Sequence, residues 1–330
     1  MQETDTAPRD CDVLVIGGGP AGSTVSTLLA RQGHRVVLLD KDHHPRFHIG
    51  ESLLPANMPL LDRLGVGDAV RAIGMFKPGA EFVSPQHSHT QTYYFADAWD
   101  KSMPTAYQVK RADFDHLLLR NAAEQGVEVH EGTLARELRW AADGQRVASV
   151  VSSDAQGRST EWRPRFLVDA SGRDTFLAGR LKTIEKNPDL NSAAVYAHFR
   201  GARRHEGQDA GNITIFWFEH GWFWFIPLSD GATSVGMVTW PYHMKTRGGR
   251  ELMDFLLDNI RHCPPLAERL AGAQPATPAE ATGNYSSRST LSHGAGFLLL
   301  GDAYAFIDPV FSSGVWLAMS VLLLRVGSMG

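Results

Sequence analysis

Residues 11–22 of the chain read CDVLVIGGGPAG, a short apolar run followed at once by a glycine-rich turn. Gly17, Gly19 and Gly22 form the pattern G-x-G-x-x-G, and residues 23–32 continue as a run of small and apolar residues typical of a helix. A second apolar run, residues 35–39, ends at Asp40. This order predicts a βαβ unit with buried parallel strands and a dinucleotide-binding turn.

Each residue of this turn has its own physical role. Gly17 permits the tight turn, Gly19 lets the backbone approach a pyrophosphate, and Gly22 allows close packing of helix against strand. The start of the helix offers free N–H groups to the anion, and Ala21 in the turn before it is assigned to the cofactor site as well. Asp40 is placed to accept hydrogen bonds from ribose hydroxyls. The alternative is a glycine turn in a βαβ unit that binds no nucleotide.

The composition is that of a folded globular protein, since 43% of the 330 residues are hydrophobic and 21% are charged. Lys and Arg number 32 against 36 Asp and Glu, so the formal net charge is −4. That balance gives no reason to expect binding to nucleic acid or to an anionic membrane. Two cysteines, Cys11 and Cys263, make neither a disulfide framework nor a zinc set, which favours a reducing cytoplasmic setting.

Neither a targeting segment nor a metal site is expected from the sequence. Residues 1–10 lack the apolar region of a signal peptide. The apolar run at 315–324 is shorter than the roughly 20 helical residues that cross a bilayer. His43, His44 and His48 share one loop without regular ligand spacing, so we expect no metal site.

The rest of the chain predicts an α/β fold in which one domain is interrupted by another. The nucleotide-binding pieces occur early, in the middle and late, so we assign residues 1–75, 105–190 and 290–330 to one discontinuous domain. Strand-like segments between residues 192 and 240 are rich in aromatic side chains. We therefore expect an inserted antiparallel sheet, built from residues 76–104 and 191–289, that covers one face of a pocket. Residues 51–64 are expected to form a helix, and residues 65–78 an irregular segment.

Three further motifs carry a resemblance to a known family. Arg111 begins a helix-like stretch, residues 167–173 read LVDASGR, and residues 299–314 read LLGDAYAFIDPVFSSG. In this order the motifs resemble flavoprotein monooxygenases with the glutathione-reductase-like FAD-binding Rossmann fold. The resemblance implies that Asp302 holds the ribityl chain of FAD and that Arg111 and Arg46 lie along the cofactor. It places the stretch containing Pro309, Gly314 and Val315 beside the isoalloxazine ring.

Two more motifs resemble the flavin-dependent halogenases within that superfamily. Residues 221–227 read GWFWFIP and match W-x-W-x-I-P through Trp222 and Trp224, and residues 76–82 read FKPGAEF. Lys77 falls where those halogenases carry their catalytic lysine, and residues 48–55, HIGESLLP, are also similar to the family. The resemblance extends from residue 11 to residue 315.

The resemblance implies a reaction and its participants. FADH2, supplied by a separate flavin reductase, reacts with O2 to give a hydroperoxide that oxidises chloride or bromide to hypohalous acid. Backbone N–H groups at Ser313 and Gly314 hold the halide, and Lys77 relays the oxidant to an aromatic substrate that is free or tethered to a carrier protein. Trp222, Trp224 and Phe311 separate the substrate from the flavin. Such chemistry is typical of secondary metabolism, including antibiotic biosynthesis.

The sequence also departs from part of the family. Tryptophan halogenases carry a glutamate at the position of Phe311, and its absence indicates electron-rich substrates resembling phenols or pyrroles. Trp316 stands where a smaller residue or a histidine is expected. Lys77 could be a solvated charge, and the aromatic run could be two faces of a buried strand. An aromatic hydroxylase, a prenyl-chain reductase and an inactive flavin-binding fragment are the alternatives, the last because the chain ends soon after the helix that Gly314 opens.

Overall fold

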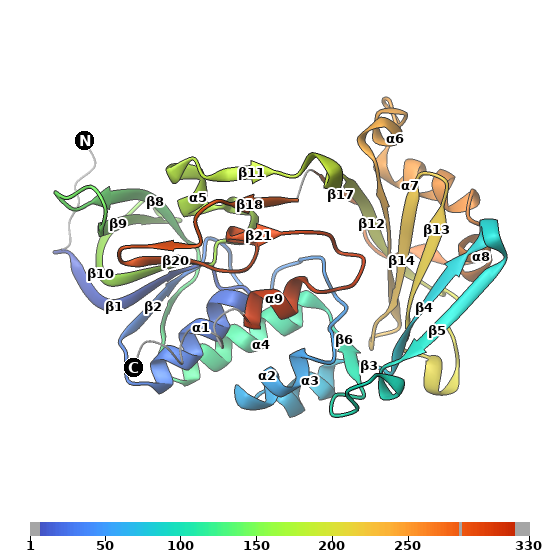
Figure 1. Ribbon diagram of the computed structural model, residues 1–330, viewed down its shortest axis with the longest axis horizontal. Helices are drawn as coiled ribbons and strands as arrows, with labels where there is room; N and C mark the ends of the chain where they lie inside the picture. The colour runs from blue at the N-terminus through green and yellow to red at the C-terminus, as the bar shows by residue number, and fades with distance from the viewer. Residues whose placement is uncertain (1–6, 284–285, 321–330) are drawn as a thin grey trace.

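The computed structural model describes residues 7–283 and 286–320. Two large sheets lie on opposite sides of the molecule (Figure 1). The first contains five parallel neighbours in the order β20-β10-β1-β2-β7. Their bounds are β1 (Arg9–Ile16), β2 (Val36–Leu39), β7 (Glu128–His130), β10 (Ser159–Asp169) and β20 (Phe297–Leu299). The βαβ unit predicted from residues 11–40 is therefore the centre of this sheet.

Both faces of the first sheet are covered, as expected for parallel strands with near-continuous apolar runs. Helices α1 (Pro20–Arg31) and α4 (Arg111–Glu124) pack on one face, where Val15, Leu38 and Leu119 belong to one buried cluster. The other face packs against β8 (Thr133–Trp140), β9 (Val147–Asp154) and α5 (Phe176–Leu181). β9 pairs antiparallel with β10, and β19 (His293–Gly294) pairs antiparallel with β20.

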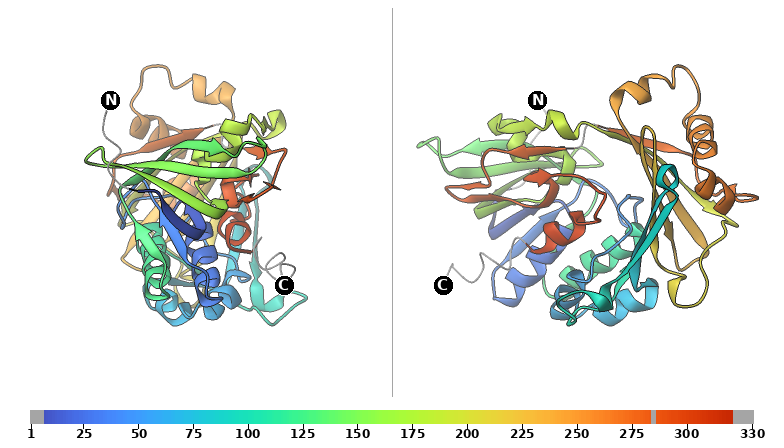
Figure 2. Two further views of the ribbon diagram at one scale, coloured as in Figure 1. Left: turned by 90° about the vertical axis from the view of Figure 1, so that its left-hand side faces the viewer. Right: turned by 45° about the vertical axis from the view of Figure 1, so that its right-hand side comes forward.

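The second sheet has the order β16-β12-β15-β14-β13-β4-β5, with β17 paired to β12. We expected it to be antiparallel; its pairs are antiparallel except β13 with β4, which run parallel because β4 enters from an earlier part of the chain. Figure 2 shows the two sheets facing each other across the middle of the molecule. The bounds are β4 (Gly79–Ser84), β5 (His89–Tyr94), β12 (Ala193–Arg200), β13 (Ile213–Phe218), β14 (Gly221–Pro227), β15 (Ala232–Thr239), β16 (Gln274–Pro275) and β17 (Glu280–Gly283).

Alternation along β14 gives the second sheet two different apolar faces. Phe223 and Phe225 face outward and pack under α7 (Leu252–Arg261) and α8 (Pro264–Arg269), with α6 (Pro241–Lys245) nearby. Trp222, Trp224 and Ile226 belong to a separate cluster on the inner face. The alternative considered from the sequence, in which the aromatic run forms the two faces of one buried strand, is therefore correct for β14. The inner of these two faces is directed at the first sheet.

Short elements connect the two sheets. β3 (Met75–Lys77) pairs with β6 (Ala106–Gln108), and β11 (Ile184–Lys186), β18 (Ser287–Ser289) and β21 (Ala305–Phe306) form a small sheet. The helix expected over residues 51–64 is wrong at its start, because α2 spans only Asn57–Arg63. Residues 51–53 are instead extended and lie beside β6. The stretch expected to be irregular contains α3 (Gly67–Ile73).

The last described helix, α9 (Gly314–Ser320), packs against α1 (Figure 1). The remainder of the apolar run at 315–324, residues 321–324, lies outside the described residues. In residues 7–283 and 286–320, no helix is both long and apolar enough to cross a membrane. Over the same ranges, no three His, Cys, Asp or Glu side chains are grouped to hold a metal ion. The domain boundaries stay a prediction, although both β4 and β5, from the first segment assigned to the inserted region, join the second sheet.

Candidate functional site

A cavity of about 820 Å³ lies between the two sheets. It is lined by Leu134 and Arg136, by the glycine-rich turn, and by Trp222 and Trp224. The volume is within the range of roughly 300–1,000 Å³ that small-molecule and cofactor sites occupy. The cavity also brings together most of the predicted cofactor residues, namely Gly17, Gly19, Ala21, Asp40, Arg46, Arg111, Asp302, Pro309, Gly314 and Val315.

The glycines leave a cradle that fits a pyrophosphate. Gly17 has φ +103°, and a Cβ there would lie 2.3 Å from the carbonyl oxygen of Ala170. A Cβ on Gly22 would lie 1.8 Å from the Gly17 carbonyl oxygen, so the helix packs on the turn itself. A Cβ on Gly19 would meet only Arg46 Nη2, at 3.9 Å, and no side chain caps the N-terminus of α1. Free helix N–H groups and open space therefore meet at Gly19.

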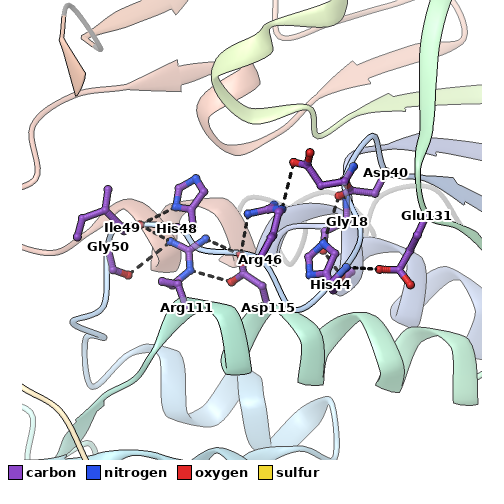
Figure 3. Close-up of polar contacts among 12 residues, drawn as sticks. Gly18, Asp40, His44, Arg46, His48, Ile49, Gly50, Arg111, Asp115 and Glu131 are labelled. Carbon is purple, nitrogen blue, oxygen red and sulfur yellow. Dashed lines mark hydrogen bonds and ion pairs between the residues drawn. The ribbon is translucent and has the colours of Figure 1, made fainter. Parts of the chain in front are cut away.

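Asp40 is held as an anion at the end of β2. Its Oδ2 accepts a hydrogen bond from the Gly18 N–H at 2.6 Å, and its Oδ1 accepts one from the Asp42 N–H at 2.8 Å (Figure 3). Burial works to raise the pKa of Asp40, but the hydrogen bonds from His44, Asp42 and Gly18 lower it overall. The carboxylate lines the cavity and keeps acceptor capacity for ribose hydroxyls.

Two arginines along the cavity share one carboxylate (Figure 3). Arg111 donates from Nε and Nη2 to the two oxygens of Asp115, at 2.7 and 3.0 Å, and from Nη1 to the Ile49 carbonyl oxygen at 3.0 Å. Arg46 Nη1 lies 3.7 Å from Asp115 Oδ2. Arg111 thus fixes the loop at Ile49 to helix α4 and presents its edge to the cavity, whereas Arg46 is the more accessible charge.

Asp302 lies where the last strand of the first sheet ends, at the start of the short turn before β21. Burial raises its pKa to about 6, and the positive charges of Arg111 and Arg173 oppose that rise. Arg173 also lines the cavity and donates to Thr282 Oγ1 on β17, so it bridges the two sheets. Arg173 is part of the motif LVDASGR, but it was not predicted as a site residue.

The loop before α9 brings only some of the predicted halide and wall residues to the cavity. Pro309, Gly314 and Val315 line it together with Ser312, whereas Ser313 does not. Phe311, expected to help separate substrate from flavin, is 69% exposed and lies outside the lining. The reason is the left-handed backbone at Ser312, φ 56°, which turns the chain so that Phe311 points away.

Trp222 and Trp224 form part of the cavity wall. Both are buried, with ring centroids 6.1 Å apart. The Trp224 indole donates from Nε1 to Ser234 Oγ at 3.1 Å and lies across Gly236, where a Cβ would be 2.1 Å from the ring. Glycine at position 236 therefore makes the room that this indole needs.

Among residues 7–283 and 286–320, the buried amine of Lys77 contacts no carboxylate. Its side chain is 1% exposed, and Nζ donates to Ser52 Oγ at 2.8 Å and to the Leu53 carbonyl oxygen at 2.9 Å. The Phe95 ring centroid lies 5.2 Å from Nζ. Burial lowers the pKa of Lys77 to about 7. The alternative considered from the sequence, in which Lys77 is a solvated charge, is therefore wrong. Lys77 does not line the cavity, but Ser52 does.

Comparison with known proteins places the chain in a family. Residues 10–321 match the model of an FAD binding domain. The structure superposes on that of the myxobacterial chondrochloren halogenase CndH with a TM-score of 0.91 and 36% identity, covering 98% of this chain and 77% of that one. The chain belongs to the flavin-dependent halogenases.

Two curated members of the flavin-dependent halogenases are similar in sequence along almost the whole chain. The tryptophan 2-halogenase of Chondromyces crocatus is 39% identical over 97% of this chain and 61% of its own length. The 1H-pyrrole-2-carbonyl-(peptidyl-carrier protein) brominase of Pseudoalteromonas luteoviolacea is 32% identical over 94% of this chain and 75% of its own. The chain spans 61–66% of the length of the first curated halogenases that it matches.

The structure adds residues to the site that the halogenase motifs did not single out. Glu51 and His198 are both buried, and His198 Nε2 lies 3.0 and 3.2 Å from the two Glu51 oxygens. His48 is half-buried beside Arg111, and desolvation lowers its pKa to about 4. The motif HIGESLLP already contained Glu51 and Ser52. No local signal pointed to His198, because strand pairing brings it to the loop from 147 residues away.

Proposed function

We propose that this protein is an FADH2-dependent halogenase of electron-rich aromatic substrates. The observation that carries the proposal is one continuous cavity that joins the dinucleotide cradle to the Trp222 and Trp224 wall, with the buried amine of Lys77 directly behind Ser52. FADH2 and O2 would supply the oxidation of chloride or bromide to hypohalous acid. The chain's own residues are assigned three steps: binding of the cofactor and halide, separation of the substrate from the flavin, and delivery of the oxidant to the substrate.

Binding of the cofactor is assigned to the cradle and its charges. The N-terminus of α1 and Arg46 would neutralise the pyrophosphate, Asp40 would accept from ribose, and Asp302 from the ribityl chain. Support comes from Gly19, whose Cβ position is open, and from Asp40, which is held ionised. The halide is assigned to the backbone beside Gly314, which lines the cavity; Ser313 stays a prediction.

Separation of the aromatic substrate from the flavin is assigned to Trp222 and Trp224. Both indoles are buried and packed, so they form a fixed wall and not a mobile lid. A wall of this kind keeps the substrate from direct oxygen transfer, while a small hypohalous acid passes. The substrate would then receive halogen by electrophilic substitution.

Delivery is assigned to Lys77. An amine with a pKa of about 7 is present as both ammonium and free amine at neutral pH. The ammonium can hold hypohalous acid by hydrogen bonding, and the free amine can attack its halogen to give a haloamine and water. Either route needs the amine to be buried near the cavity, as it is.

The substrate and partners are proposed at the level of chemistry. An aromatic ring activated by its own heteroatom, free or carrier-tethered, is proposed because the sequence position at which tryptophan halogenases carry a glutamate holds Phe311 in this chain. Relatives named for tryptophan and for a carrier-bound pyrrole both resemble the chain, so they favour neither. A separate flavin reductase is proposed as the source of FADH2.

The test is product formation with a flavin reductase, NADH, FAD, O2 and a panel of phenols, pyrroles and indoles, with and without chloride or bromide. The expected result is a halide-dependent mass gain of one halogen in place of one hydrogen. A gain of oxygen would indicate a hydroxylase, and a gain of hydrogens a prenyl-chain reductase. Either result without halogenation contradicts the proposal.

A second arm tests the lysine in that same assay. Lys77→Met is expected to lower halogenation at least 100-fold while FAD binding and halide-dependent formation of hypohalous acid continue. Lys110→Met, at a lysine paired with Asp230 on the surface, is the matched control. Full halogenation by Lys77→Met would show that delivery does not use this residue.

A further inference from the structure

The contact between Lys77 and Ser52 determines how the buried amine communicates with the cavity. Lys77 and Leu53 do not line the cavity, whereas Ser52 does. The Ser52 hydroxyl accepts from Nζ at 2.8 Å, and the Leu53 carbonyl oxygen accepts at 2.9 Å. Ser52 therefore contacts both the amine and the cavity.

Ser52 is held in place by backbone pairing. The Leu53 N–H donates to the Tyr107 carbonyl oxygen at 3.0 Å, and the Val109 N–H donates to the Glu51 carbonyl oxygen at 2.8 Å. These bonds pair residues 51–53 with one edge of β6, while β3, which carries Lys77, pairs with the other edge. The amine thus reaches across β6 to a hydroxyl whose backbone has little freedom to move.

The side chain next to Ser52 adds a second anchor. Glu51 is 1% exposed and its carboxylate contacts His198 Nε2 on β12. β12 belongs to the sheet that carries Trp222 and Trp224. The position of Ser52 is therefore tied to the same sheet as the proposed wall.

The two acceptors of Lys77 differ in what they can do when the amine loses its proton. A carbonyl oxygen only accepts hydrogen bonds, so the Leu53 contact favours an N–H of the amine in either state. A hydroxyl both accepts and donates, so Ser52 can accept from the ammonium and donate to the lone pair of the free amine. Ser52 is thus suited to keep Nζ in place through both protonation states.

We propose that Ser52 is the positioning residue of Lys77 and the path by which its proton exchanges with the cavity. The inference rests on the proposed function, in which Lys77 changes its protonation state. As Nζ loses a proton to Ser52 Oγ, the hydroxyl's own proton passes to a water molecule in the cavity, so the serine ends unchanged. Reprotonation runs by the same path in reverse.

The test measures the amine itself by NMR of protein labelled with [13Cε]lysine, the Lys77 signal being assigned by its loss in Lys77→Met. The wild-type signal is expected to titrate near pH 7. In Ser52→Ala, the midpoint is expected to fall by roughly one pH unit or more, because the ammonium loses an acceptor that the free amine needs less. Ser52→Thr, which keeps a hydroxyl, is expected to restore the midpoint.

Two further variants test whether a shift of the midpoint comes from loss of the Ser52 hydroxyl or from disturbed packing. Ser52→Cys keeps the side-chain volume but has a weak acceptor, so it should shift the midpoint as Ser52→Ala does even where the smaller residue disturbs packing. Ser84→Ala, at an exposed hydroxyl that contacts His87 in the same region, should leave the midpoint unchanged. An unchanged midpoint in both Ser52→Ala and Ser52→Cys overturns the proposal.

Turnover is measured alongside. Halogenation by Ser52→Ala is expected to fall about 10-fold in kcat with little change in KM, and its pH–rate profile to move with the NMR midpoint. An unchanged kcat and profile would also overturn the proposal. If the wild type forms no halogenated product, the proposed function fails, but the NMR titration needs no turnover and still decides the role of Ser52.

Discussion

Arg111 and Lys77 are both buried cations beside the same cavity, and their surroundings differ in one respect. Arg111 makes a two-point contact with the Asp115 carboxylate, whereas the hydrogen-bond acceptors of Lys77 are a hydroxyl and a carbonyl oxygen. Burial works to lower the pKa of both, but the charge of Asp115 raises that of Arg111 overall, while that of Lys77 falls to about 7.

This difference separates a structural charge from a reactive one. A paired guanidinium stays charged at every accessible pH, so Arg111 can only brace the loop at Ile49 and present a fixed positive edge. An unpaired amine changes charge near neutrality, at a cost in stability that packing elsewhere must offset. The following variants test whether the two cations differ in this way.

The largest effect is expected from Asp115→Asn, which removes the counter-charge of Arg111 at nearly constant volume. Unfolding free energy should fall by about 3–5 kcal/mol, because a buried charge is left unpaired. Arg46, which also faces Asp115, should lose part of its support, so FAD should bind more weakly. Chemical denaturation measures the change, and Asp113→Asn on the exposed side of the same helix is the control. A loss below about 1 kcal/mol would show that Arg111 does not depend on the pair.

Lys77→Met should have the opposite sign. The folded pKa of about 7 lies below the unfolded value of about 10.4, so the wild type pays the full burial penalty below pH 7. The variant should be more stable at pH 6 by about 2–4 kcal/mol, after allowing for the contacts that Lys77 makes.

The pH dependence distinguishes this cause from simple packing. Between pH 7 and pH 10 the unfolded wild-type chain binds more protons than the folded one, so wild-type stability rises and the advantage of Lys77→Met should shrink. Denaturation at pH 6, 8 and 10 measures the trend, with Lys101→Met at an exposed lysine as reference. An advantage that does not change with pH would mean that the lysine is not titrating near neutrality.

The same contrast explains what could be predicted from sequence. The cradle could be predicted because Gly22 packs on Gly17, and Asp40 accepts from Gly18, within a single βαβ unit. The position of Lys77 followed from a motif, but its contact with Ser52 spans 25 residues and depends on β6 lying between them. The predicted helix start at residue 51 was wrong for the same reason. Residues 51–53 pair with β6, and this pairing outweighed the helical spacing of the leucines.

The wall at Trp224 offers a third test. A methyl group on Gly236 would overlap the indole, so Gly236→Ala should tilt Trp224 into the cavity and lower unfolding free energy by about 1–3 kcal/mol. FAD binding at the cradle should change little, whereas halogenation of bulkier substrates should fall first. Gly283→Ala, on β17 of the same sheet, is the control, because its Cβ would meet Ala193 at an ordinary 3.5 Å. Equal stability and equal substrate range in both variants would mean that the indole moves freely.

The smallest effect is expected at Asp302, an acid whose buried position also opposes its charge. Its folded pKa of about 6 is above the unfolded value of about 3.9, so the folded chain binds more protons between those pH values and stability falls as pH rises through them. Asp302→Asn removes this loss, and its stability relative to the wild type should therefore increase from pH 4 to pH 7 by about 1–2 kcal/mol. FAD affinity should fall about 5- to 10-fold, because an amide is a weaker acceptor for the ribityl hydroxyls. Thermal unfolding of the FAD-free protein and fluorescence titration with FAD separate the two effects. A relative stability that is flat in pH would show that Asp302 is already ionised at pH 4, and Arg111 and Arg173 would then be sufficient to hold its charge.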